Sequence, residues 1–187
     1  MRIIGGRMRG LGLASVGKGD ASAHLRPTSD RVRESLFSML EGGRFDDPIR
    51  DAQVLDLFAG TGALGLEALS RGASQVCFIE NGRTALKLLS DNIAKARVEA
   101  TTDVKRMDAT RLSVCETPAS LVFLDPPYDK GLGEKALSVT ARQGWLAKGA
   151  LIVWEEASDQ SPPPGFSKVE ARQYGQTWIT FLTYQAD

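Results

Sequence analysis

The sequence predicts an α/β protein built on a doubly wound parallel sheet. Short apolar runs alternate with segments of helical periodicity between residues 54 and 154, a pattern typical of parallel sheets covered by helices. The first run leads into a glycine-rich turn, where sheets of this class bind their ligands. The length of 187 residues, with 42% hydrophobic and 25% charged residues, is ordinary for one globular domain.

The first 25 residues differ from the rest of the chain. They contain many glycines and short apolar pairs such as Ile3-Ile4, which favour a hairpin of short strands. We therefore expect an N-terminal basic arm over residues 1–25 and a main domain over residues 26–187.

A helix is predicted directly after the arm. Thr28 and Asp30 are its candidate N-caps, and Gly42-Gly43 ends it. Val32, Leu36, Met39 and Leu40 recur at helical spacing and should face the core, while Arg31, Arg33 and Glu34 lie off that stripe.

The main domain then follows as alternating elements. Five apolar segments are predicted to be parallel strands, and a final pair, joined at Gly175-Gln176, is predicted to be a hairpin. The predicted strands are 54–58, 75–80, 102–107, 121–124, 150–154, 167–174 and 177–184, and the predicted helices between them are 63–71, 83–97 and 132–142.

A glycine motif follows the first predicted strand. Gly60, Gly62 and Gly65 fit the pattern G-x-G-x-x-G, and Glu80 lies twenty residues after Gly60. Glycines at such a turn allow positive φ and close approach of a ligand, and an acid at this spacing can bind ribose hydroxyls. The motif predicts a site for a nucleoside-containing cofactor.

The acid Asp56, at the end of the first strand, helps to choose the cofactor. A carboxylate beside the pyrophosphate of a nicotinamide cofactor would be repelled, whereas an ammonium or a sulfonium would be attracted. S-adenosylmethionine carries both of these cations and no phosphate, so we expect it in preference to NAD. The alternative for Asp56 is that it only caps the turn.

A second motif, Asp125-Pro126-Pro127-Tyr128, ends the fourth predicted strand. Because proline fixes φ and has no N–H, the Asp125 carboxylate and the Pro126 carbonyl are acceptors without competing backbone donors. These two acceptors suit the two N–H groups of an exocyclic amine, and Tyr128 offers a ring on which a base can stack. The alternative is a turn that merely ends the strand.

Together these motifs resemble a known family. Asp56-Leu-Phe-Ala-Gly-Thr-Gly and Asp125-Pro-Pro-Tyr are similar to the class I S-adenosylmethionine-dependent methyltransferases that act on exocyclic amines. Met1-Arg-Ile-Ile-Gly-Gly and residues 26–40 resemble the RsmD family of bacterial ribosomal RNA guanine-N2 methyltransferases. The resemblance implies a Rossmann-like sheet in the order 3-2-1-4-5-7-6 with the last hairpin antiparallel, preceded by a short N-terminal hairpin and helix extension. It also implies N2-methylguanine in small-subunit (16S) ribosomal RNA as the product.

The resemblance also assigns roles to residues. It places the amine and the base against Asp125, Pro126, Pro127 and Tyr128. Asp108 would face the adenine of the cofactor, although an ordinary helix cap is the alternative for this residue. The full set implied for the cofactor is Asp56, Phe58, Ala59, Gly60, Thr61, Gly62, Glu80, Asn81, Asp108, Ala109 and Thr28.

Recognition of RNA is expected mainly from the arm. Residues 1–19 carry Arg2, Arg7, Arg9 and Lys18 and no acid, although the net charge of the whole chain is zero. These cations, with Arg26 and Arg31, would bind phosphates of ribosomal RNA, a small ribosomal subunit or an assembly intermediate, and the target base would be flipped out of its stack. The alternative is a solvated arm.

Several other readings stay open. The same acceptor-Pro-Pro-aromatic motif also suits an N6-adenine methyltransferase or an enzyme that methylates a protein glutamine amide, and a non-catalytic RNA-binding module is a third class.

Cys77 and Cys115 lack metal-ligand spacing, and no metal is expected. With no apolar run near the roughly 20 residues of a membrane span and no signal-peptide pattern, we expect a cytoplasmic protein.

Overall fold

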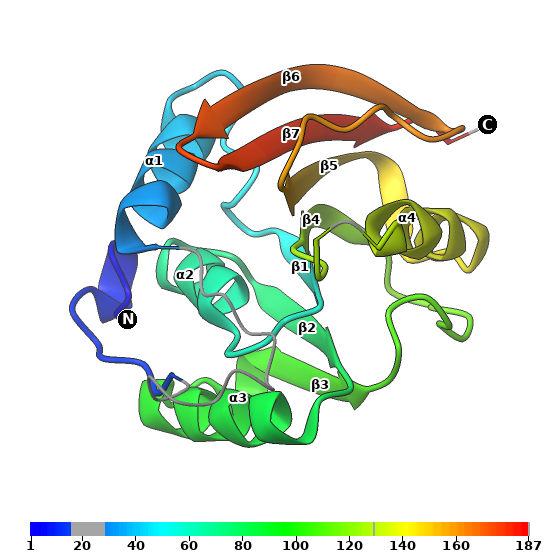
Figure 1. The fold of residues 1–187 in the computed structure, drawn as a ribbon. Coiled ribbons are helices and arrows are strands. Elements are labelled where there is room, and N and C mark those ends of the chain that lie inside the picture. Colours follow the sequence, from blue (N-terminus) through cyan, green and yellow to red (C-terminus); the bar gives the residue numbers. More distant parts are fainter. Residues whose placement is uncertain (16–28, 129, 187) are drawn as a thin grey trace.

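The computed structural model describes residues 1–15, 29–128 and 130–186. Seven strands form one sheet in the order β3-β2-β1-β4-β5-β7-β6 (Figure 1), which confirms the predicted α/β class and strand order. The strands are β1 (Gln53–Leu57), β2 (Gln75–Glu80), β3 (Thr102–Arg106), β4 (Ala119–Leu124), β5 (Leu146–Glu156), β6 (Phe166–Tyr174) and β7 (Thr177–Tyr184).

The pairing of the strands is parallel from β3 to β5, and β7 runs antiparallel to both β5 and β6. Most predicted bounds agree with the structure to within one or two residues. The exception is β5, which begins at Leu146, where it pairs with Ala119 before a register shift. Lys148 and Gly149 interrupt the apolar run there, and Gly149 has a positive φ of 76°, so the sequence showed only the later part of the strand.

Helices cover both faces of the sheet. The helices α1 (Asp30–Glu41), α2 (Ala63–Ser70) and α3 (Arg83–Ala96) lie on one face, and α4 (Leu132–Arg142) lies on the other (Figure 1). Successive side chains of a strand point to opposite faces, so Val54 packs with the first three helices and Leu55 packs with α4. This burial on both faces explains why the central strands read as continuous apolar runs.

Two expectations about α1 were wrong. Its N-cap is Ser29, whose side chain accepts a hydrogen bond from the Val32 amide at 3.3 Å, rather than Thr28 or Asp30. Arg33, expected off the core stripe, has an exposed fraction of 0%. Its guanidinium donates to the Asp30 carboxylate and to the Arg2 carbonyl, and these partners make the burial of a charge possible.

The N-terminal arm, of which residues 1–15 are described, folds back on itself as an irregular hairpin, in which the amides of Ile3 and Leu13 donate to the carbonyls of Leu11 and Met1. It has one antiparallel bridge, between Arg2 and Gly12, and a short 3-10 helix over Gly6–Met8. Ile3 and Leu13 are buried in the core that α1, α2 and α3 share with the sheet. The arm therefore packs against the main domain through apolar side chains.

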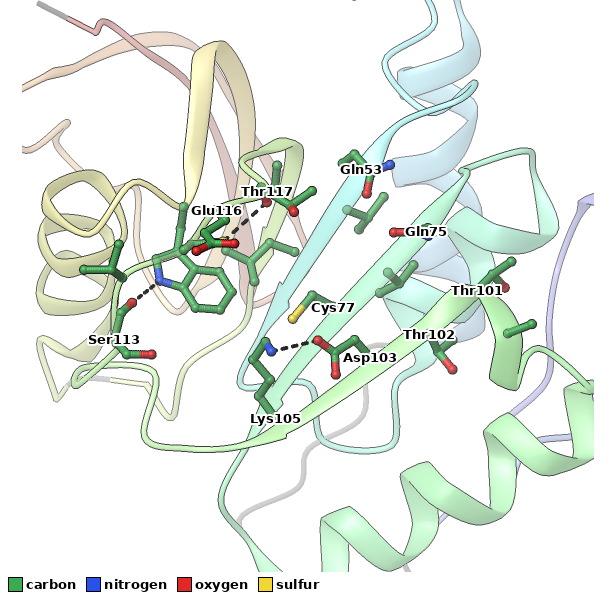
Figure 2. A pocket seen from close by; sticks show the side chains of 18 residues that line it. Gln53, Gln75, Cys77, Thr101, Thr102, Asp103, Lys105, Ser113, Glu116 and Thr117 are labelled. Carbon is green, nitrogen blue, oxygen red and sulfur yellow. Dashed lines mark hydrogen bonds and ion pairs between the residues drawn. The ribbon is translucent and has the colours of Figure 1, made fainter.

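A cavity of about 450 Å³ lies at the amino-terminal halves of β1, β2 and β3 (Figure 2). Residues 107–118, which connect β3 to β4, form no helix, so no helix covers this part of the face. Lys105 pairs with Asp103 on the wall, and the Trp145 indole donates to the Ser113 carbonyl at 2.7 Å. This cavity lies away from the carboxyl ends of the strands, where both predicted motifs lie.

Among the described residues, no helix has the length and apolarity that crossing a membrane requires.

Candidate active site

The turn between β1 and α2 has an unusual backbone. Phe58, Gly60 and Gly62 all adopt left-handed conformations, with φ of 59°, 56° and 77°. A Cβ at Gly62 would lie 2.4 Å from a Leu89 methyl carbon, so both the conformation and the space require glycine there. Phe58 has a side chain and still adopts a positive φ, a form of strain that clusters at functional sites.

Asp56 lies under this turn and is 2% exposed. Its Oδ2 accepts a hydrogen bond from the Gly65 amide, in the first turn of α2, at 2.9 Å. Burial, opposed by the hydrogen bond from the Gly65 amide and assisted by the nearby charge of Glu80, raises the pKa of Asp56 to about 8. The capping interaction left open by the sequence is thus present. A buried acid at this helix end disfavours an anion such as a pyrophosphate and favours a cation.

Glu80 joins the end of β2 to the same turn. Its Oε2 accepts from the Gly60 amide at 2.8 Å, and its Oε1 accepts from the amides of Asn81 and Gly82 at 2.8 and 2.6 Å. The carboxylate is therefore fixed beside the glycine turn, partly exposed, with oxygen lone pairs that a hydroxyl can still approach.

Asp125 follows the last residue of β4, next to the end of β1. Leu57 pairs with Leu124, and the Asp125 amide lies 3.5 Å from the Leu57 carbonyl oxygen. Burial raises the pKa of Asp125 well above its usual range, and the charges of Glu155, Asp56 and Glu156 raise it further. The two acids predicted from separate motifs therefore lie near enough to influence each other.

Tyr128 is held by an acid that the sequence analysis did not single out. Its hydroxyl donates to Glu155 Oε1 at 3.0 Å, and burial, followed by the Glu155 charge, raises the pKa of Tyr128. Glu155 and Glu156 end β5 and are each 6% exposed. The sequence did contain a signal for this part of the site, since two acids directly follow the apolar run 150–154 and so lie at the carboxyl end of a third strand.

Asp108 follows β3 at the same edge of the sheet. Its Oδ1 accepts from both the amide and the hydroxyl of Thr110, each at 2.8 Å, and these bonds lower the pKa of Asp108. Asp108 thus caps a local turn, close to the alternative that the sequence left open. Ala109 is buried, and Asn81 is exposed.

The cations expected to bind RNA lie on the surface where they are described. Arg7, Arg9 and Arg31 are exposed, and Arg2 is exposed with its Nε 3.7 Å from Asp30. The remaining predicted contacts, Lys18, Arg26 and Thr28, lie outside the described residues.

The site as a whole is a group of acidic side chains at the carboxyl ends of neighbouring strands. It presents carboxylates from β1, β4 and β5 and the partly exposed Glu80 from β2. These carboxylates, which accept hydrogen bonds, fit a cofactor that carries positive charge and ribose hydroxyls. Within the part of the chain that the structure describes, no group of three or more side chains is arranged to hold a metal ion.

The chain matches known proteins over most of its length. A family model described as "conserved hypothetical protein 95" matches residues 1–183. The protein named ribosomal RNA small subunit methyltransferase D of Escherichia coli K12 is 42% identical over 163 residues, which are 87% of this chain and 78% of the relative. The protein of the same name from Haemophilus influenzae is 36% identical over 165 residues, covering 86% and 80%.

The fold of a solved structure agrees with these matches. The Escherichia coli structure named yhhF superposes with a TM-score of 0.84 at 39% identity, and the match covers 100% of this chain and 99% of the other. The seven-stranded order with its antiparallel last hairpin, the glycine turn and the Asp-Pro-Pro-Tyr motif are those expected from the sequence. The chain therefore belongs to the RsmD family, the ribosomal RNA small subunit methyltransferases D, and has the class I methyltransferase fold.

Proposed function

We propose that the protein transfers a methyl group from S-adenosylmethionine to the exocyclic N2 amine of a flipped-out guanine in 16S ribosomal RNA, in the cytoplasm. The observation that carries this proposal is a pair of acids at adjacent strand tips, the buried Asp56 beneath the glycine turn and the half-buried Asp125 in the Asp-Pro-Pro-Tyr motif. The similarity to relatives named ribosomal RNA small subunit methyltransferase D supports the substrate class.

Residues around the glycine turn would hold the cofactor. When bound, S-adenosylmethionine supplies a methyl group activated by a sulfonium. The carboxylate of Asp56 stabilises the positive charge of the methionine part, Gly60 and Gly62 let it approach the backbone, and Glu80 accepts from the ribose hydroxyls. Asp108, at the tip of β3, would face the adenine amine.

Residues at the tip of β4 would hold the base. The Asp125 carboxylate and the Pro126 carbonyl accept the two N–H groups of the amine, which orients the nitrogen lone pair toward the methyl carbon. The Tyr128 ring, anchored through its hydroxyl to Glu155, stacks on the base. A stacked guanine cannot present its amine in this way, so the base leaves the helix before transfer.

Asp125 would also accept the proton that the reaction displaces. As the N2–carbon bond forms and the carbon–sulfur bond breaks, the nitrogen becomes positively charged and must lose one proton. The carboxylate already accepts a hydrogen bond from that nitrogen, and its raised pKa makes it a better proton acceptor than an ordinary aspartate. A metal or a strongly basic group is not required for this step.

Methyl incorporation into a panel of substrates tests the proposed function. The purified protein is incubated with labelled S-adenosylmethionine and, separately, small ribosomal subunits, naked 16S RNA, DNA or release factors, and the products are digested and identified. We expect N2-methylguanosine from the small subunit or its RNA. N6-methyladenosine or methylglutamine would instead identify the alternative acceptors that suit the same motif.

The contribution of the arm to RNA recognition is tested by removing two cations. Arg7→Ala with Arg9→Ala should weaken RNA binding in a filter assay and reduce the magnitude of the salt slope by about 1 to 2, because two phosphate contacts are lost. Arg142→Ala with Lys148→Ala removes two exposed cations, at the end of α4 and in β5, and is the matched control. Equal affinity and slope in both double variants would exclude the arm from RNA recognition.

A further inference from the structure

Asn92, a side chain of α3 with an exposed fraction of 0%, connects two segments that are far apart in the sequence. Its Oδ1 accepts from the Ala14 amide at 2.7 Å, and its Nδ2 donates to the Ala14 carbonyl at 3.2 Å and to the Thr61 carbonyl at 2.9 Å. Both hydrogens of the amide are therefore used. One goes to the N-terminal arm and the other to the glycine turn.

The arm contacts the glycine turn a second time through its first residue. The Thr61 hydroxyl lies 3.9 Å from the Met1 sulfur, within hydrogen-bonding range for sulfur. Met1 is joined to the other end of the described arm, because the Leu13 amide donates to the Met1 carbonyl at 3.0 Å. Met1 therefore contacts Thr61 directly, whereas Ala14 is connected to Thr61 through Asn92.

The middle of the arm is attached to α2, the helix that starts at this turn. The Glu67 carboxylate accepts from the amides of Ile4 and Gly5 at 2.7 and 2.8 Å, and the Ser70 hydroxyl accepts from the Met8 amide at 2.8 Å. Glu67 is fully buried and also pairs with Arg71 at 2.8 Å. The arm, the turn and α2 therefore form one hydrogen-bonded unit.

We propose that Asn92 is a positioning residue that couples the arm to the cofactor turn, so that cofactor binding and RNA binding strengthen each other. This inference rests on the proposed function, in which the turn holds the cofactor and the arm holds RNA. A ligand that orders the turn fixes the Thr61 carbonyl, and through Asn92 this orders the arm for the second ligand. The coupling is reciprocal, because linkage requires each ligand to change the affinity of the other by the same factor.

The coupling is measured by equilibrium dialysis of labelled S-adenosylhomocysteine, with and without small ribosomal subunits from a strain that lacks the gene. For the wild type we expect subunits to tighten binding about fivefold or more, the lower range of typical coupling. In Asn92→Ala the factor should fall below twofold. Ser90→Ala, at an exposed position of the same helix, should keep the wild-type factor.

A second variant acts from the arm and leaves α3 unchanged. Ala14→Pro removes the N–H that Asn92 accepts, at a partly exposed arm position, so it keeps the test valid if Asn92→Ala does not fold. Both variants should raise the KM values for cofactor and subunits while kcat at saturation stays within about threefold, because neither residue contacts the reacting atoms.

The outcomes separate the two proposals. An active wild type whose cofactor affinity is indifferent to subunits, or a folded Asn92→Ala or Ala14→Pro variant with the full coupling factor, overturns the inference and leaves the proposed function standing. A wild type that neither binds S-adenosylhomocysteine nor methylates RNA overturns both.

Discussion

Replacing Asp56 by asparagine separates the role of this residue in the fold from its role toward the cofactor. The asparagine oxygen can accept the same bond from the Gly65 amide, so the cap at the start of α2 is kept. What changes is the charge. Asp56 is buried, and its pKa is raised from 3.8 to about 8 in the folded protein, so ionisation of this group opposes folding.

The sign and the size of the stability effect follow from this shift. A carboxyl group whose pKa is higher in the folded state stabilises the fold while it is protonated, and that stability is lost as pH rises from about 3.8 to about 8. From the linkage relation, Asp56 should cost the wild type about 1.4 kcal/mol of unfolding free energy between pH 7 and pH 9. Asp56→Asn lacks this titration, so urea unfolding at the two pH values should show a smaller loss.

Asp56→Asn should weaken cofactor binding, although it makes the fold less sensitive to high pH. Hydrogen bonds to charged groups contribute about 1.5–3 kcal/mol, so Asp56→Asn should bind S-adenosylmethionine roughly 10- to 150-fold more weakly in calorimetry. A bound cation also lowers the pKa of Asp56, so the wild type should release protons on binding at pH 7, seen by comparing buffers of different ionisation enthalpy. Asp91→Asn, which removes an exposed acid of α3, should change neither result. Binding by Asp56→Asn within threefold of the wild type, with the same proton release, would refute the assignment.

Three further predictions concern the amine site and the arm. Asp125→Ala should reduce kcat about a thousandfold or more, since it removes both the acceptor and the proton sink, while the cofactor Kd stays within threefold; retained turnover would contradict its role. Glu155→Gln removes a charge that raises the pKa of Asp125. The acidic limb of the pH profile of kcat/KM, where Asp125 becomes protonated, should therefore move to lower pH. An unchanged acidic limb would show that another group controls it. Gly6→Ala should lower the melting temperature and weaken RNA binding, because a Cβ there would lie 1.8 Å from the Ser70 carbonyl oxygen. The control Gly10→Ala, also at positive φ but with open space around it, should show only the effect of backbone strain. Equal effects of the two substitutions would argue against docking of the arm on α2.

The arrangement of strands and the convergence of the two acids could be predicted from the sequence because both are local signals. Asp56 and Asp125 each end an apolar run, and in a parallel sheet such ends meet at one edge. The sequence could not show that Asp56 would also bond the Gly65 amide, since the geometry of a turn with three left-handed residues decides which donor faces the carboxylate.

The parts that the sequence did not predict depend on partners far along the chain. Arg33 was expected off the core-facing stripe of its helix, and it is buried with its Nη2 donating to the Arg2 carbonyl and to Asp30 and its Nε 3.9 Å from Glu67. Asn92 gave no signal at all, since its partner Ala14 lies 78 residues away. The sequence likewise did not show that the arm docks on α2 through Glu67 and Ser70, which lie about 60 residues further along the chain.

The most direct test of the account is nucleoside mass spectrometry of 16S ribosomal RNA from a strain that lacks the gene, complemented with the wild type or with Asp125→Ala. We expect one N2-methylguanosine to be lost on deletion, restored by the wild type and absent with the variant. Modification that is unchanged when the gene is deleted, or fully restored by Asp125→Ala, would contradict the claim that this acid binds the amine of a ribosomal guanine.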